Sequence, residues 1–151
     1  MRYTLDTNIL INMELRYPRE FFASLWDLMK AAVEQGEICM CEVAQKELER
    51  GVDSLASWVM SIPDFVCKIT DDELATVAEI ATTHPEWVQG QKNYGDPIAH
   101  AKADDLIIMT EEGRKSPGIA DKNQKIPNIA DEHGVTCIKF FDLLRAQGWR
   151  F

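Results

Sequence analysis

The residue types best suited to catalysis in this chain are carboxylic acids spread along its length: Asp6, Glu47, Asp96 and the adjacent pair Glu111 and Glu112. Asp6 follows a short apolar run at the start of the chain, and Glu111 follows the most apolar run, residues 106–110. If both runs are parallel strands, their carboxyl ends meet at one edge of a sheet, which is where ligands bind in such folds. The spacing therefore predicts that these acids converge on one site.

Like charges gathered in a fold repel one another unless a cation neutralises them. Mg²⁺ and Mn²⁺ prefer hard oxygen ligands, and the residue types do not discriminate between the two ions. A divalent ion at such a site lowers the pKa of a bound water and stabilises charge on a phosphoryl oxygen. The expected chemistry is metal-assisted hydrolysis of a phosphodiester.

Each acid taken alone has a simpler structural interpretation. Asp6 and Asp96 would serve as helix N-caps. Glu47 would be a solvated helix residue that pairs with a neighbouring cation. Glu111 and Glu112 would be polar loop residues. The metal-site hypothesis depends on all of them meeting at one edge of the sheet.

Hydrophobic patterning predicts the elements that must position these acids. Strands are predicted at residues 3–5, 37–40, 106–110 and 135–138, and residues 65–69 are predicted as a strand or an extended link. Helices are predicted at residues 18–35, 42–50, 53–60, 70–82, 95–103, 126–133 and 140–147. Residues 84–94 and 111–125 are predicted to be irregular. Alternating short strands and helices predict an α/β fold with a mostly parallel sheet, and no linker divides residues 1–151.

The bulk composition excludes some classes of protein and leaves others open. No apolar run approaches the roughly 20 residues of a membrane span. Asp6 and Asn8 interrupt any signal-peptide core at the start, so a cytoplasmic protein is expected. The net charge of −9 opposes a broad contact with nucleic acid. Either the chain binds no nucleic acid, or its acids are concentrated at a metal site.

Residues outside the acid set invite functional and structural interpretations alike. The four cysteines, Cys39, Cys41, Cys67 and Cys137, match no zinc-ligand spacing and are interpreted as small buried apolar residues without a redox role. His100 lies four residues after Asp96, and it is interpreted as a ligand, a proton shuttle, a nucleic-acid contact or an inert, partly exposed helical residue.

Basic and aromatic side chains near the acids are candidates for RNA contacts. Arg114 and Lys115 belong to a loop that either guides an RNA backbone or is simply solvated. Trp87 and Tyr94 flank Asp96, where they either stack on a base or pack in the core.

The acidic segments resemble the motifs of PIN-domain nucleases. Residues 5–10, Leu-Asp-Thr-Asn-Ile-Leu, closely match the opening signature of that superfamily. Residues 42–48 resemble its second motif, and residues 95–103 followed by 107–112 resemble the third acid and the strand that leads to the fourth. The closing segment, residues 144–151, looks like an uncharacterised prokaryotic PIN-like family related to VapC-type toxins.

This resemblance implies a three-layer α/β/α sandwich that binds Mg²⁺ or Mn²⁺ and cleaves RNA endonucleolytically. It also implies the toxin of a toxin–antitoxin pair, with an antitoxin protein as partner and frequent homodimerisation.

The resemblance also assigns roles to individual residues. Asp6, Glu47 and Asp96 match the best-kept acids of the superfamily, and Thr7 and Asn8 match supporting positions after the first acid. The fourth acid is usually an Asp two residues after the Ser or Thr that ends the strand. Because Thr110 ends the strand here, that position is Glu112, and Glu111 is the next candidate. The longer Glu side chain leaves indirect ligation open.

Two other function classes remain open. A phosphotransfer domain of the haloacid-dehalogenase type also has an Asp at a strand end, but it would need a second Asp at position 8, where Asn8 stands. A catalytically inactive PIN-like binding module would be compatible with the substitution of Asp by Glu112.

Overall fold

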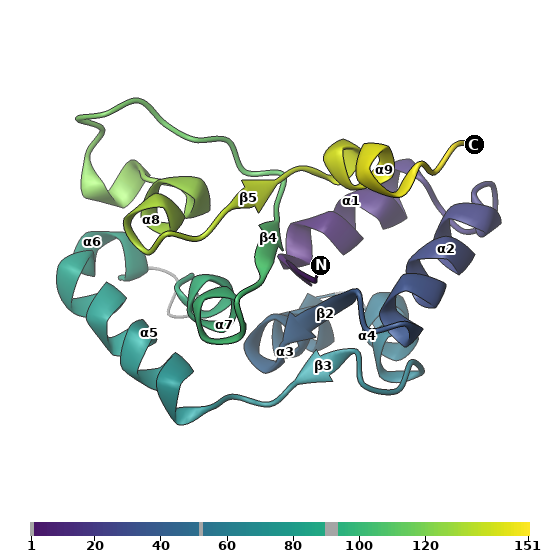
Figure 1. Cartoon of the computed structure of the whole chain (residues 1–151), viewed down its shortest axis with the longest axis horizontal. Helices are drawn as coiled ribbons and strands as arrows, with labels where there is room; N and C mark the ends of the chain where they lie inside the picture. The colour runs from purple at the N-terminus through teal and green to yellow at the C-terminus, as the bar shows by residue number, and fades with distance from the viewer. Residues whose placement is uncertain (1, 52, 90–93) are drawn as a thin grey trace.

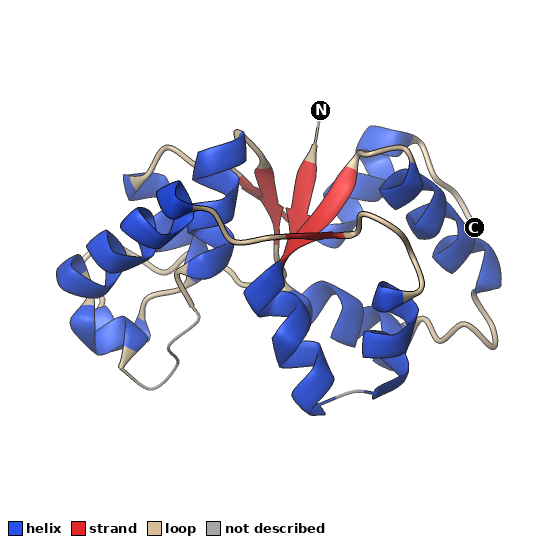
Figure 2. Cartoon of the chain, turned by 90° about the horizontal axis from the view of Figure 1, so that it is seen from below, coloured by secondary structure: helices blue, strands red, loops and turns tan. Residues whose placement is uncertain are grey.

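A computed structural model of the chain describes residues 2–51, 53–89 and 94–151. A central sheet lies between two layers of helices (Figures 1 and 2). Its strands are β1 (Tyr3–Leu5), β2 (Ile38–Cys41), β3 (Val66–Cys67), β4 (Ile107–Met109) and β5 (Cys137–Ile138). They run parallel to one another in the order β3-β2-β1-β4-β5. This arrangement confirms the predicted α/β class and the three-layer sandwich with a parallel sheet.

One layer of helices covers the face of the sheet that carries Leu5 and Met109. Its helices are α1 (Thr7–Arg16), α2 (Ala23–Glu34), α3 (Glu42–Gly51), α4 (Asp53–Met60) and α9 (Phe140–Gln147). Trp26 and Phe65 are among the largest fully buried side chains of this core. Each such side chain contributes on the order of 2–3 kcal/mol when it leaves water, so this core stabilises the helices around β1.

The other layer covers the face that carries Cys39 and Ile108. Its helices are α5 (Asp71–Thr83), α6 (Pro85–Val88), α7 (Asp96–Asp104), α8 (Ile126–Glu132) and the 3₁₀ helix η1 (Asp121–Asn123). Because apolar side chains cover both faces, the strands are continuous apolar runs rather than alternating ones. In the part of the chain that the structure describes, no helix has the length and apolar content to cross a membrane.

Local sequence signals explain where α5 and α7 begin. Thr70 Oγ1 accepts a hydrogen bond from the Glu73 amide at 3.3 Å and so caps the start of α5. A Cβ added to Gly95 would lie 3.3 Å from Cγ2 of Ile80 on α5. Glycine therefore lets the first turn of α7 press closely against α5.

Two segments differ from the prediction in where a helix lies. Residues 9–11 belong to α1, a helix that was not predicted, because three consecutive apolar residues do not show a helical period. The helix predicted from Pro18 begins at Ala23, because the amides of Phe21 and Phe22 bond the Pro18 carbonyl in a preceding turn.

The segments predicted to be irregular contain short helices. Residues 84–94 include α6, and residues 90–93 lie outside the described residues. Residues 111–125 include η1.

The strand order places a topological switch point between β1 and β4. From β1 the chain adds β2 and β3 on one side of the sheet and then crosses to add β4 and β5 on the other. Loops that leave β1 and β4 at their carboxyl ends diverge, and the crevice between them is where ligands bind in open parallel sheets. Asp6 directly follows β1, and Thr110 directly follows β4.

Candidate metal centre

A pocket of about 210 Å³ lies at the carboxyl ends of β1 and β4. Its wall is formed by residues at or just before the starts of α1, α7 and α8, together with residues of α3 and of the segment after β4: Asp6, Thr7, Asn8, Ala44, Glu47, Tyr94, Pro97, Glu112 and Ile126. Three of the predicted acids therefore line one pocket. Asp96, the fourth, precedes Pro97 in the first turn of α7.

Asp6 faces the crevice rather than serving as a helix cap. It occupies the N-cap position of α1, but its side chain makes no capping hydrogen bond. Its Oδ2 instead accepts a hydrogen bond from Thr110 Oγ1 at 2.8 Å, which links the ends of β1 and β4. Burial raises the pKa of Asp6, although the hydroxyl of Thr110 partly offsets this effect. The simpler interpretation of Asp6 as an N-cap is therefore wrong.

Glu47 projects from α3 toward the same pocket. The Thr7 hydroxyl lies 3.3 Å from Glu47 Oε2 and 3.4 Å from Asp6 Oδ1, so it bridges two carboxylates that are 41 positions apart in the chain. Burial raises the pKa of Glu47, and the nearby charges of Asp6 and Asp96 raise it further. A solvated helix residue would show neither effect.

Asp96 is the first residue of α7, and Gly95 holds the N-cap position. The interpretation of Asp96 as an N-cap is therefore also wrong. Burial raises the pKa of Asp96 to about 6. An acid in the first turn is favoured by the helix dipole, but its burial beside other acids opposes ionisation.

The structure separates the two candidates for the fourth acid. Glu112 lines the pocket, and its burial together with the charge of Asp6 raises its pKa to about 7. Glu111 points elsewhere: its Oε1 accepts a hydrogen bond from the Phe140 amide at 3.0 Å, at the start of α9. Glu112 is thus the acid that belongs with Asp6, and Glu111 anchors α9.

Polar side chains around the switch point hold the acids in place. The hydroxyl of Thr110 accepts hydrogen bonds from Asn8 Nδ2 at 3.3 Å and from the Glu112 amide at 3.1 Å. Asn8 Oδ1 accepts from the Glu111 amide at 3.2 Å. These bonds tie Asn8 in the first turn of α1 to the segment that leaves β4.

The donor set of this pocket fits a hard divalent cation. The pKa of Tyr94 is raised mainly by burial and further by three nearby carboxylates, those of Glu112, Asp6 and Glu47. These carboxylates therefore act on the same region. Within the described residues, no three of the four acids each bring an oxygen within 4.8 Å of one another. An ion among them would therefore keep water ligands or draw side chains inward, and Mg²⁺ usually retains several waters.

The predicted nucleic-acid contacts have different outcomes. His100 is fully buried, so its interpretation as a nucleic-acid contact and its interpretation as a partly exposed helical residue are both wrong. The Arg114 guanidinium is exposed but makes two 2.7 Å hydrogen bonds to Asp131. Lys115 is exposed, and its role stays a prediction. Trp87 is buried and stacks on Tyr94 with ring centroids 5.2 Å apart, so it packs in the core.

Sequence reasoning missed one cluster of functional residue types. Cys39, Cys67 and His100 lie together because parallel strands β2 and β3 are neighbours and α7 packs over them. Zinc-ligand spacing along the chain did not reveal this group, since its members are separated by 28 and 33 positions. The available signal was a cysteine in each of two consecutive predicted strands.

Comparisons with known proteins assign the chain to a family but add no activity. A family model described as a domain of unknown function, DUF4411, matches residues 3–151. No curated protein matches the chain. The geometry of the pocket is therefore the main guide to its chemistry.

Proposed function

We propose that this chain, which belongs to the DUF4411 family, is a divalent-metal-dependent endoribonuclease. The observation that carries the proposal is the acid pocket at the β1–β4 switch point, where Asp6, Glu47 and Glu112 line one wall and Asp96 stands beside it. Acids gathered in a partly buried pocket suit a cation rather than an anionic ligand. The resemblance to PIN-domain nucleases supports a phosphodiester as substrate.

The four acids would hold Mg²⁺ or Mn²⁺, with Asp6 and Asp96 as direct ligands and Glu47 and Glu112 acting directly or through water. When bound, the ion supplies Lewis-acid stabilisation of the charge that develops on the phosphoryl oxygens. Thr7 and Thr110 fix the orientation of the Asp6 carboxylate through their hydroxyls. Glu112, whose pKa lies at about 7, is the carboxyl group suited to hold a proton near neutral pH.

Local cations would supply the RNA contact, although the net charge of −9 opposes a broad contact with nucleic acid. Lys125 acts on Glu112 and lowers its pKa, so one ammonium group stands near the pocket. A second hollow of about 510 Å³ between α1 and α9 is lined by Arg16, Lys139 and Arg145, and by Glu111. A phosphate backbone could follow these cations toward the acids.

The biological setting follows from the same resemblance. An RNA-cleaving toxin of this kind would act in the cytoplasm and would be held inactive by an antitoxin protein. Homodimerisation is part of the same proposal.

A cleavage assay tests the proposal directly. The full-length chain should cleave labelled single-stranded RNA in Mg²⁺ or Mn²⁺ and lose this activity in EDTA. Asp6→Asn and Asp96→Asn should reduce the rate by at least about a hundredfold, because each removes a charged ligand from the ion. Asp27→Asn, which alters an exposed Asp on α2, should leave the rate unchanged.

Two outcomes would overturn the proposal. Equal metal-dependent cleavage by both acid variants would show that the active site lies elsewhere. Tight metal binding without cleavage of any RNA would instead identify a binding module.

A further inference from the structure

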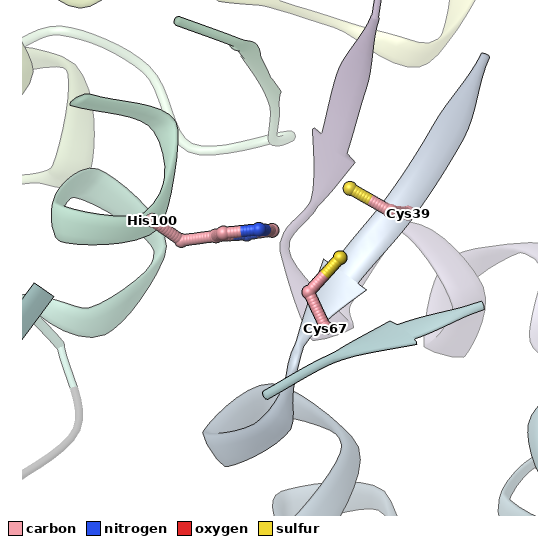
Figure 3. Close-up of side chains that lie close together, drawn as sticks. All are labelled: Cys39, Cys67 and His100. Carbon is pink, nitrogen blue, oxygen red and sulfur yellow. The ribbon is translucent and has the colours of Figure 1, made fainter. Parts of the chain in front are cut away.

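We propose a second metal site, separate from the acid pocket, in which Cys39, Cys67 and His100 bind Zn²⁺. The two sulfurs and one ring nitrogen all lie within 4.8 Å of one another. Figure 3 shows His100 extending from α7 toward the sulfurs, which come from the region of β2 and β3. Thiolate and imidazole are the ligand types that Zn²⁺ prefers.

The spacing of these atoms is close to that of a bound ion. Zn–S bonds of about 2.3 Å in a tetrahedral site place two sulfurs roughly 3.8 Å apart. Small side-chain rotations would therefore bring the group to ligand geometry. The sheet fixes the backbone: Met40 pairs with Val66 and Cys41 pairs with Cys67, so Cys39 and Cys67 come from adjacent strands.

His100 has a ring nitrogen that the protein does not satisfy. Its Nδ1 lies 3.0 Å from the hydroxyl of Thr4, a fully buried residue of β1. Its Nε2 is buried and has no hydrogen-bond partner among the described residues, although Asp104 Oδ2 lies 3.3 Å away. If Nδ1–H donates to Thr4, Nε2 keeps its lone pair for a metal, which is the usual arrangement of a metal-binding histidine.

Carboxylates beside His100 offer an oxygen for the remaining position. Glu73, His100 and Asp104 also present ligand atoms within 4.8 Å of one another. Glu73 is buried at the start of α5, and Asp104 lies one helical turn after His100. The two groups share His100 but are otherwise separate, so Glu73 or Asp104 would have to move toward the sulfurs to complete the site.

Zn²⁺ binds cysteine as the thiolate, so binding at this cluster would release the thiol protons to solvent.

Such an ion would join α7 to two strands that are already paired in the sheet. It would link β2, β3 and α7, and α7 carries Asp96 one helical turn before His100. The zinc site would therefore stabilise the helix that presents an acid to the other pocket. Its existence does not depend on the nuclease proposal.

Cobalt substitution of the full-length chain tests the site without an activity assay. Co²⁺ added to the reduced, metal-free protein should give a thiolate-to-cobalt absorption band, which oxygen ligands in the acid pocket cannot produce. Cys67→Ser should abolish the band or weaken binding by more than about tenfold. Cys137→Ser is the matched control, because Cys137 is similarly part-buried in the two-residue strand at the opposite edge of the sheet, and it should leave the band intact.

The wild-type chain gives an independent measurement that does not rely on a variant folding. Zn²⁺ should protect Cys67 from alkylation while Cys137 continues to react, as read by mass spectrometry, and should raise the melting temperature. No cobalt band in the wild type, or a band unchanged in Cys67→Ser, would overturn the proposal. The proposal would also be overturned if Cys39 and Cys67 formed a disulfide and the reduced protein bound no metal.

Discussion

Asp6 accepts a hydrogen bond from the Thr110 hydroxyl, and this bond joins the ends of β1 and β4 at the acid pocket. The neighbouring acids are partly buried, and burial raises the pKa of both Asp96 and Glu112. Each carboxylate therefore costs free energy when it ionises in the folded chain without a cation. The pocket stores electrostatic strain that metal binding would relieve.

This strain predicts that an acid-to-amide change stabilises the metal-free fold. Asp96 has a pKa of about 6 in the folded chain against 3.8 when unperturbed, so between these values the folded state holds more protons than the unfolded state. The free energy of unfolding therefore falls as pH rises through this window. Asp96→Asn should raise the free energy of unfolding by roughly 1–2 kcal/mol near neutral pH, once screening by solvent is taken into account. Near pH 4 the same substitution should have little effect.

Urea unfolding in EDTA at both pH values measures this difference. Asp27→Asn provides the control, because Asp27 is exposed on α2. An Asp96→Asn variant that is less stable than the wild type near neutral pH would contradict the electrostatic account.

Residue types and their positions in the chain predicted the three acids that line the pocket, but not their individual contacts. In sequence terms, Asp6 and Asp96 could each be an ordinary helix cap. The structure shows that the Asp6 side chain makes no capping hydrogen bond. It also shows that Gly95, and not Asp96, holds the N-cap position of α7. Glu111 and Glu112 are adjacent and chemically alike, so the sequence could not separate them. The direction in which the chain leaves β4 decides between them, and that direction is a tertiary property.

Helices on the second layer are joined by His84, which lies between α5 and α6. Its Nδ1 lies 2.5 Å from Asp121 Oδ1 in η1, and its Nε2 lies 2.6 Å from Glu132 Oε2 in α8. Burial alone would lower the pKa of His84, but the carboxylates of Glu132 and Asp121 raise it. The protonated ring thus holds three elements together.

Replacing His84 should weaken the fold in a pH-dependent way. Because the folded pKa lies above the unperturbed 6.5, the stabilisation is fully present below pH 6.5 and is lost as pH rises through the folded value. His84→Gln should therefore cost roughly 1–2 kcal/mol in acidic buffer and less in alkaline buffer. Urea unfolding across a pH series measures the difference, with His133→Gln as the control; a cost that does not vary with pH would refute the ion-pair role.

Elements with a long period or a cap signal were predicted well, and short ones were not. Thr70 is the N-cap of α5, which begins within one residue of the predicted start, and the helix 140–147 has the predicted bounds. The helix α1 was missed, because its apolar residues form a continuous short run that also suits a strand. Its course depends on packing against β1 and α3, which local patterning does not encode.

At the scale of the molecule, strand order explains why distant acids meet. The β3-β2-β1-β4-β5 sequence places the ends of β1 and β4 side by side, and α3 and α7 each add an acid beside them. Alternating strands and helices predicted a parallel sheet, and the rule that ligands bind at carboxyl ends of strands indicated which edge to examine. The pairing of β2 with β3 was not predicted, and the cluster of Cys39, Cys67 and His100 was missed for that reason.

We expect the pocket at the β1–β4 switch point to bind a divalent cation. Calorimetric titration of the metal-free chain with Mn²⁺ tests it most directly, since Mn²⁺ favours oxygen over sulfur ligands. The account predicts binding in the wild type, in Asp27→Asn and in Glu111→Gln, and an affinity at least about tenfold lower in Asp6→Asn and Glu112→Gln. Mn²⁺ binding of equal strength in Asp6→Asn and the wild type would contradict it.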